Sequence, residues 1–225
     1  MATLPVLPLQ YPVLLLPASR ITVPVKKEVG QQLISLIHES EAQPVVAAVP
    51  IINPESAQDE EPVLNEWGTS ARIARLVRPS ALNPSENFLV TLHGLTRVRL
   101  AKPLQIASGT LDEMPYHSVE YPPTEGAPQR EQVIAFKGAA LRLLDRLKLD
   151  APKGSQKDTW SKFASMVEEI SDSRVGWLAD VMVAGIIVDY SDRLSEYLSL
   201  CAALPRIFYP IAHKMKFRFP CGVQC

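Results

Sequence analysis

The stretch Phe88-Leu89-Val90-Thr91-Leu92-His93-Gly94-Leu95-Thr96-Arg97-Val98 decides the fold class of this chain. Its first half is rich in apolar and β-branched residues, which is typical of a strand. Gly94-Leu95 predicts a tight reversal there. From Thr96 to Leu100 apolar and basic residues alternate, so Val98 and Leu100 should share one face and Arg97 and Arg99 the other. The stretch therefore predicts two strands inside a β-rich unit.

The surrounding sequence up to Tyr121 has the same character. The chain contains 20 Pro and only 10 Gly, a balance that favours short strands and stiff connections over long helices. Leu33, Ile34 and Ile37 follow helical spacing and predict a short helix over 31–40. Further strands are expected at 4–9, 13–16, 21–25, 45–52, 70–77, 104–106 and 117–121.

After a linker with three prolines at 122–128, the apolar period changes from 2 to 3.6. A helix is expected from about Arg130 to Leu149. Asp158 should cap a second helix, which carries Trp160 on its core face. A third helix over 174–189 is apolar most of the way round and includes Trp177, also expected in the core; a fourth is expected near Ser191. The predicted fold class is α+β, with a β-rich domain at 1–123, a helical domain at 124–200 and a divergent, disordered tail at 201–225.

Motifs for common enzyme chemistry are absent from the sequence. It contains no G-x-x-x-x-G-K-[ST], G-x-G-x-x-G, G-x-S-x-G or H-E-x-x-H. The four histidines are scattered, with no carboxylate or nucleophile at a diagnostic offset; they are His38, His93, His117 and His213. The sequence therefore predicts no catalytic residue and no cofactor, although scattered residues such as His93 and His117 could still converge in space.

The cysteines lie together at the end of the chain, at 201, 221 and 225. A secreted scaffold would spread an even number of cysteines through its fold, so this pattern favours a reducing, intracellular compartment. With His213 they form a possible zinc set, but their spacing matches no usual pattern and the favoured C-x-x-C is missing, so no metal site is expected. The formal net charge of −1 favours neither nucleic acid nor an anionic membrane as a partner.

Three stretches together resemble the amino-terminal domain of Lon proteases. Leu4-Pro5-Val6-Leu7-Pro8-Leu9 is similar to the start of that domain, and Gly68-Thr69-Ser70-Ala71-Arg72-Ile73 to its G-T-x-A-x-I strand. The stretch from Phe88 to Val98 resembles its hydrophobic strand, Gly turn and G-x-x-R step. The resemblance covers about residues 4–199. One departure is Ala18, which stands where the family commonly has Gly after Pro.

The resemblance implies a PUA-like β-barrel followed by an α-helical bundle. It also implies a non-catalytic module that captures unfolded or damaged polypeptides for a Lon-type ATP-dependent serine protease and contacts other Lon subunits. The substrate-binding residues are unknown, because the family has no fixed motif for them. The alternative is a stand-alone Lon-domain adaptor that binds a specific ligand or degron.

Within the family the chain looks most like the peroxisomal type, whose acidic, Pro-containing insertion corresponds to 53–66. The composition of that segment favours a solvated loop. The alternative is an acidic arm that binds a basic partner. The implied location is the peroxisomal matrix, but the last residues, Val223-Gln224-Cys225, are no S-K-L-type signal, which leaves the cytoplasm as the alternative. Residues 201–225 resemble no Lon segment, so we expect a chain truncated before the ATPase and Ser–Lys peptidase regions.

Overall fold

The computed structural model describes residues 1–53, 62–79, 87–104, 114–122, 129–150, 155–185 and 190. The chain divides into two compact units. The first comprises residues 1–124 and 179–201, and the second residues 125–178 and 202–225. The segment 179–201 thus groups with the sheet rather than with the helices that precede it. As domains, the bounds 1–123, 124–200 and 201–225 remain a prediction.

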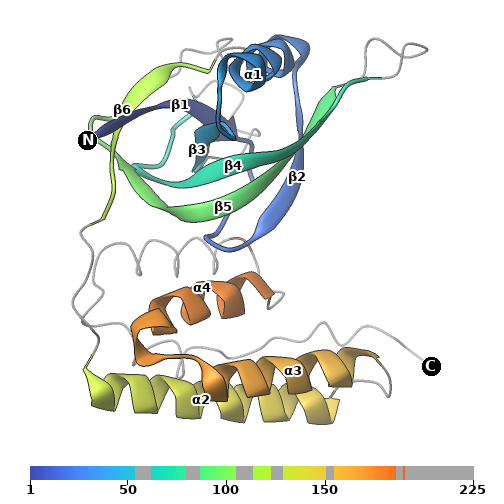
Figure 1. Cartoon of the computed structure of the whole chain (residues 1–225), viewed down its shortest axis with the longest axis vertical. Helices are drawn as coiled ribbons and strands as arrows, with labels where there is room; N and C mark the ends of the chain where they lie inside the picture. Colours follow the sequence, from blue (N-terminus) through green and yellow to red (C-terminus); the bar gives the residue numbers. More distant parts are fainter. Residues whose placement is uncertain are drawn as a thin grey trace. The chain divides into compact units, whose positions relative to one another are not determined.

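The first unit is built on a six-stranded mixed sheet in the order β2-β5-β4-β3-β1-β6 (Figure 1). β1 pairs with β3 in parallel and all other pairings are antiparallel. Two residue pairs, Arg99 with Glu120 and Leu100 with Val119, also join β6 to β5. The pairings of five strands therefore form a circuit, with β2 attached outside it. The strands are β1 Ala2–Leu9, β2 Arg20–Val25, β3 Val45–Pro50, β4 Trp67–Val77, β5 Phe88–Leu100 and β6 Tyr116–Glu120.

The sheet buries apolar side chains on both faces. The larger cluster joins one face of β2, β3, β4 and β5 to helix α1, Lys27–Glu39, through residues such as Val29, Leu33 and Val90. A smaller cluster lies on the opposite face near the β5–β6 junction and contains Val6, Val49 and Val98. Strand residues alternate between the two clusters, as the two-residue period of a strand requires.

β5 is one continuous strand, so the reversal predicted at Gly94-Leu95 is wrong. Instead, the pairing with β4 shifts there: Ala71 lies opposite Gly94 and Ser70 opposite Thr96, which leaves Leu95 as the extra residue of a bulge. A Cβ on Gly94 would lie 2.3 Å from the carbonyl oxygen of Leu16. Gly94 is therefore required for close approach of another backbone rather than for a turn.

The strand predicted at 13–16 is also absent, although Leu14, Leu15 and Leu16 are buried. These residues belong to a connection that crosses β5: the Ala18 N–H donates to the Gly94 carbonyl (3.0 Å) and the Gly94 N–H donates to the Ser19 carbonyl (2.9 Å). An apolar run between prolines is equally compatible with a buried connection, so sequence period alone could not separate the two.

Helices α2, Arg130–Asp150, and α3, Ser155–Glu169, pack together in the second unit. Lys137 of α2 donates to the Ile170 carbonyl at 2.6 Å. The α3 helix begins before Asp158, which lies in its first turn instead of capping it. The short turn Asp172–Arg174 then leads into α4, Val175–Gly185.

The expectation that Trp177 lies in the core is wrong. The buried apolar side chains described in α4 are Val175, Leu178, Ala179 and Met182, a stripe with helical spacing that excludes Trp177. Trp177 is 37% exposed, and the guanidinium of Arg174 lies 4.8 Å from its ring centroid. A helix that is apolar all round gives no local signal for which side is buried.

The segment from 179 onward contacts the strands of the first unit. Asp180 forms an ion pair with Arg97 of β5, and both side chains are largely buried. Tyr190 packs edge-on against Tyr11, with ring centroids 4.7 Å apart. No described helix is both long and apolar enough to span a membrane. The predicted fourth helix and the tail 201–225 lie outside the described residues.

Together the mixed sheet and the helices confirm the predicted α+β class.

Candidate functional site

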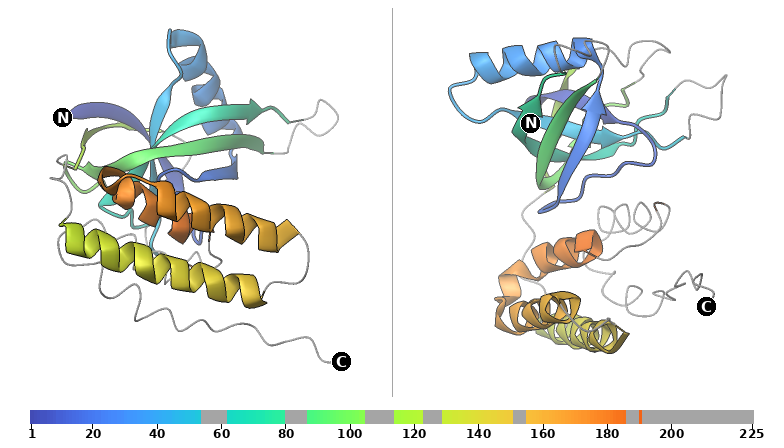
Figure 2. Two further views of the ribbon diagram at one scale, coloured as in Figure 1. Left: turned by 60° about the horizontal axis from the view of Figure 1, so that its bottom comes forward. Right: turned by 90° about the vertical axis from the view of Figure 1, so that its right-hand side faces the viewer.

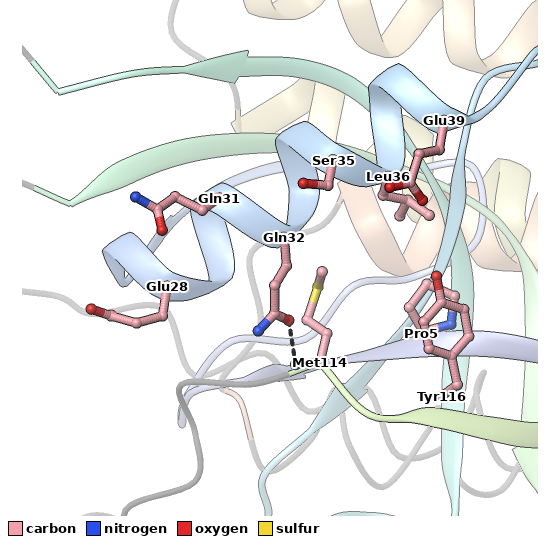
Figure 3. Close-up of a pocket in the computed structure, with 9 residues that line it drawn as sticks. All are labelled: Pro5, Glu28, Gln31, Gln32, Ser35, Leu36, Glu39, Met114 and Tyr116. Carbon is pink, nitrogen blue, oxygen red and sulfur yellow. Dashed lines mark hydrogen bonds between the residues drawn. The ribbon is translucent and has the colours of Figure 1, made fainter.

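A pocket of about 630 Å³ opens between α1 and the β1–β6 edge of the sheet (Figure 3). This volume falls within the range of ordinary ligand pockets, roughly 300–1,000 Å³. The described residues that line it all belong to the first unit. They are Pro5, Glu28, Gln31, Gln32, Ser35, Leu36, Glu39, Met114 and Tyr116.

One face of α1 forms the wall of the pocket. Its six lining residues run from Glu28 to Glu39 at the spacing i, i+3, i+4, i+7, i+8 and i+11, which places them on a continuous stripe of a helix. Two carboxylates lie at the ends of the stripe, and the amide and hydroxyl groups lie between them together with the apolar side chain of Leu36. At 1.5 Å per residue the stripe is about 16 Å long, the span of about five residues of an extended chain.

The opposite face of α1 holds the helix against the sheet. Val29, Gly30 and Leu33 are buried there. Gly30 lies directly over the ring of Phe88, where a Cβ would come within 2.4 Å of the ring carbon Cγ. Because a glycine allows this close approach, α1 is seated deeply and the position of the pocket wall is set by the core.

The floor of the pocket comes from β1 and β6. Pro5 lies opposite Tyr116 in the antiparallel pairing of these strands, and Tyr116 is 65% exposed. Gln32 links wall and floor, because its Oε1 accepts a hydrogen bond from the Met114 N–H at 2.8 Å. Figure 3 shows Gln32 pointing from α1 toward Met114. The floor therefore presents apolar and aromatic surface beneath a polar wall.

The pocket combines three chemical features. Gln31, Gln32 and Ser35 carry donors and acceptors that could pair with the amides of another backbone. Among the described residues, the Nε2 of Gln32 has no hydrogen-bond partner. Pro5, Met114 and Tyr116 offer apolar contact, and the described residues of the lining include two glutamates but no lysine or arginine. Such a surface can offer backbone hydrogen bonds and apolar contact to a polypeptide segment.

The histidines lie far apart from one another in the described part of the structure. His38 is exposed on α1, and His117 on β6 contacts the Lys102 carbonyl through Nε2 at 2.9 Å. His93 lies on β5 between Arg20 and Arg72 in the register of three strands. Within the described part of the chain, no three His, Cys, Asp or Glu residues are grouped as metal ligands would be. Cys201, His213, Cys221 and Cys225 lie outside the described residues.

The pocket residues were not singled out from the sequence. The apolar stripe of α1 predicted the helix, and its polar stripe from Glu28 to Glu39 was visible in the same way. However, the floor residues Met114 and Tyr116 lie about 80 positions further along the chain. Their approach to α1 depends on the pairing of β6 with β1, which no local pattern encodes.

Comparison with known proteins identifies a family and solved structures to which this chain is similar. Residues 3–195 match the family model described as ATP-dependent protease La (LON) substrate-binding domain. The fold is similar to the N-terminal domain of the Mycobacterium avium complex Lon protease, with a TM-score of 0.52, 17% identity and coverage of 88% of this chain and 97% of that one. A Lon N-terminal domain protein from Xanthomonas campestris matches at a TM-score of 0.44 and 17% identity, over 88% of this chain and 98% of the other. No curated protein sequence matches the chain significantly.

The match covers most of the chain and defines a class: a substrate-binding domain, which is non-catalytic. The chain belongs to the family of ATP-dependent protease La (LON) substrate-binding domains. The resemblance noted in the sequence, over about residues 4–199, is thereby confirmed at the level of the family.

Proposed function

We propose that this chain captures unfolded or damaged polypeptides for a Lon-type protease, and that the pocket beside α1 is a contact site for them. The observation that supports this proposal is the composition of the pocket. The amide and hydroxyl groups of Gln31, Gln32 and Ser35 lie in the middle of a stripe about 16 Å long and can pair with any backbone, whatever its sequence. The exposed Tyr116 and its apolar neighbours favour chains whose hydrophobic residues are accessible. Unfolded chains offer both features, whereas folded proteins hide them.

The expected affinity is modest. One pocket of this size, open to solvent and without a deep apolar anchor, suits a dissociation constant in the micromolar range, about −8 kcal/mol. Weak contacts of this kind become effective when several copies act together. Contact with other Lon subunits is part of the same proposal, as are the PUA-like type of the sheet and a role in peroxisomal protein quality control. The last of these is supported by the acidic, Pro-containing segment 53–66.

The test compares two tryptophan variants on α1. Ser35→Trp places a large side chain in the pocket, whereas Ile37→Trp adds the same group at an exposed position of α1 that does not line it. Binding of reduced, carboxymethylated α-lactalbumin and of native α-lactalbumin to the full chain is measured by surface plasmon resonance. We expect the wild-type chain and Ile37→Trp to prefer the unfolded form, and Ser35→Trp to lose most of that binding.

Two results would count against the proposal. Equal retention of native and unfolded α-lactalbumin by the wild-type chain would favour the stand-alone adaptor. Equal loss of binding in both tryptophan variants would show that the pocket is not the contact site.

A further inference from the structure

The three strands β2, β5 and β4 are neighbours in the sheet (Figures 1 and 2). A row of arginine and histidine side chains crosses them on the face opposite the cluster that packs against α1. Arg20 of β2 lies opposite His93 of β5, and His93 lies opposite Arg72 of β4. Residues directly opposite each other have Cβ atoms about 5 Å apart. The three side chains therefore crowd into one line across the sheet.

Two further rows continue this face. Thr22, Thr91 and Arg75 form the second row, in which the two hydroxyls lie 2.9 Å apart in a hydrogen bond. The third row is apolar. We call the three rows the arginine face; its residues are Arg20, His93, Arg72, Thr22, Thr91, Arg75, Pro24, Leu89 and Val77.

A bulge brings two of these arginines together. Residues three apart on a regular strand point to opposite faces, so Arg72 and Arg75 should be separated. The pairing of β4 with β5 shifts between Ile73 and Arg75, and Ala74 becomes the extra residue. Both arginines thus lie on one face. Bulges near functional sites often change the direction of a side chain in this way.

No described residue balances the charges of the arginine face. Among the described residues, Arg20, Arg72 and Arg75 form no ion pair, whereas Arg97 and Arg99 on the same sheet pair with Asp180 and Glu66. Arg20 and Arg75 are exposed and Arg72 is half-buried. Arg20 and Arg72 lie on either side of His93, so two positive charges stand about 10 Å apart on one face of the sheet. An anionic partner would find favourable electrostatic interactions with both of them.

We propose that the arginine face binds acidic segments of the polypeptide substrates, with an apolar residue next to the acidic ones. This inference rests on the proposed function and adds a second contact surface on the other side of the sheet from α1. Guanidinium groups bind carboxylates in a planar, two-bonded geometry, and the threonine hydroxyls supply further donors. The apolar row, with Leu89 at 43% and Val77 at 37% exposure, gives a hydrophobic neighbour a place to pack.

The spacing of the rows defines the sequence pattern. Rows two residues apart on a strand are separated by about 7 Å, which is also the distance between residues i and i+2 of an extended peptide. An extended segment lying along the strands would therefore place residues i, i+2 and i+4 over successive rows. The matching pattern is acidic-x-acidic-x-apolar. Nucleic acid fits this face less well, because the third row is apolar and the whole chain has a net charge of −1.

The experiment uses a fluorescein-labelled peptide containing Glu-Ser-Glu-Ser-Leu and its counterpart with Gln in place of Glu, and measures anisotropy with the full chain. Arg20→Gln/Arg72→Gln/Arg75→Gln removes the charges of the arginine face. Arg130→Gln/Arg142→Gln/Arg146→Gln removes three exposed charges from α2 as a matched control. The single variant Arg75→Gln changes an exposed position and replaces the triple variant in the test if the triple variant does not fold.

The wild-type chain and the α2 control should bind the acidic peptide about tenfold more tightly than its Gln counterpart, the combined effect of two or three exposed ion pairs. The triple variant should lose this preference, Arg75→Gln should reduce it, and 0.5 M salt should suppress it. Equal binding of both peptides by wild type would overturn the inference, as would stronger binding of a DNA oligonucleotide at the same salt. If the wild-type chain fails this peptide test but still binds carboxymethylated α-lactalbumin, only the inference about the arginine face is wrong. If it binds neither, the proposed function is wrong as well.

Discussion

Gly30 of α1 lies against the aromatic ring of Phe88 on β5, so closely that a Cβ would be within 3 Å of three ring carbons. Phe88 is buried, and its pairing with Val25 of β2 leaves it little room to move. This contact fixes the depth at which α1 sits on the sheet. The wall of the candidate pocket, on the other side of the same helix, is positioned by it.

Gly30→Ala should therefore destabilise the chain by about 2 kcal/mol, the usual cost of overpacking a core, and should weaken binding of carboxymethylated α-lactalbumin. The measurement is urea unfolding followed by circular dichroism. Gly138→Ala is the control: this glycine is also helical, its Cβ would meet only the end of Arg142 at 3.5 Å, and the change should add about 0.5 kcal/mol of stability. If Gly30→Ala stabilised the chain as Gly138→Ala does, α1 would not be anchored by this contact.

Gly94→Ala should be more damaging, because its Cβ would meet the Leu16 backbone carbonyl at 2.3 Å rather than a side chain that can move. We expect a loss of about 3 kcal/mol in the free energy of unfolding. Hydrogen exchange should show faster exchange at the amides of Ala18 and Gly94, whose hydrogen bonds join the connection to β5. Unchanged exchange at both amides would contradict this role.

Ala18 has a φ of 60°, in the left-handed region that favours glycine. Ala18→Gly should relieve a strain of about 1–2 kcal/mol and lose about 0.4–1 kcal/mol through the greater freedom of the unfolded chain. The net gain should be about 0.5 kcal/mol in thermal or urea unfolding. Ala135→Gly, at an exposed position of α2, should instead cost about 1 kcal/mol. A loss of stability in Ala18→Gly similar to that control would refute the assignment of strain.

Asp180 should make stability depend on pH. Burial raises the pKa of its carboxyl from 3.8 to about 6, and the Arg97 guanidinium only partly opposes this effect. The folded chain then holds a proton that the unfolded chain has released between about pH 4 and pH 6, so stability falls as the pH rises through this window, by up to about 3 kcal/mol. Asp180→Asn cannot ionise, and its free energy of unfolding should lack this fall. Identical pH profiles for both proteins would rule the effect out.

Local patterns predicted those elements whose periods are distinct. The stripe with Leu33, the alternation of Val98 and Leu100 with Arg97 and Arg99, and the stripe with Phe136 and Leu144 all lie where their periods place them. They suffice for the α+β class, and the quoted motifs suffice for the family. Each depends only on residues within a few positions, where burial of one face leaves a regular trace.

The tertiary structure alone decided how these elements meet. Gly94 looked like a turn because glycine permits either a turn or the close approach of another backbone, and only the position of Leu16 separates the two. The pocket needs β6 beside β1, about 110 residues apart in the chain, and the arginine face needs a bulge at Ala74 together with the register of β2 on β5. Strand register is set by packing between distant segments, and a shift of one residue moves every side chain to the other face. No local period contains that information.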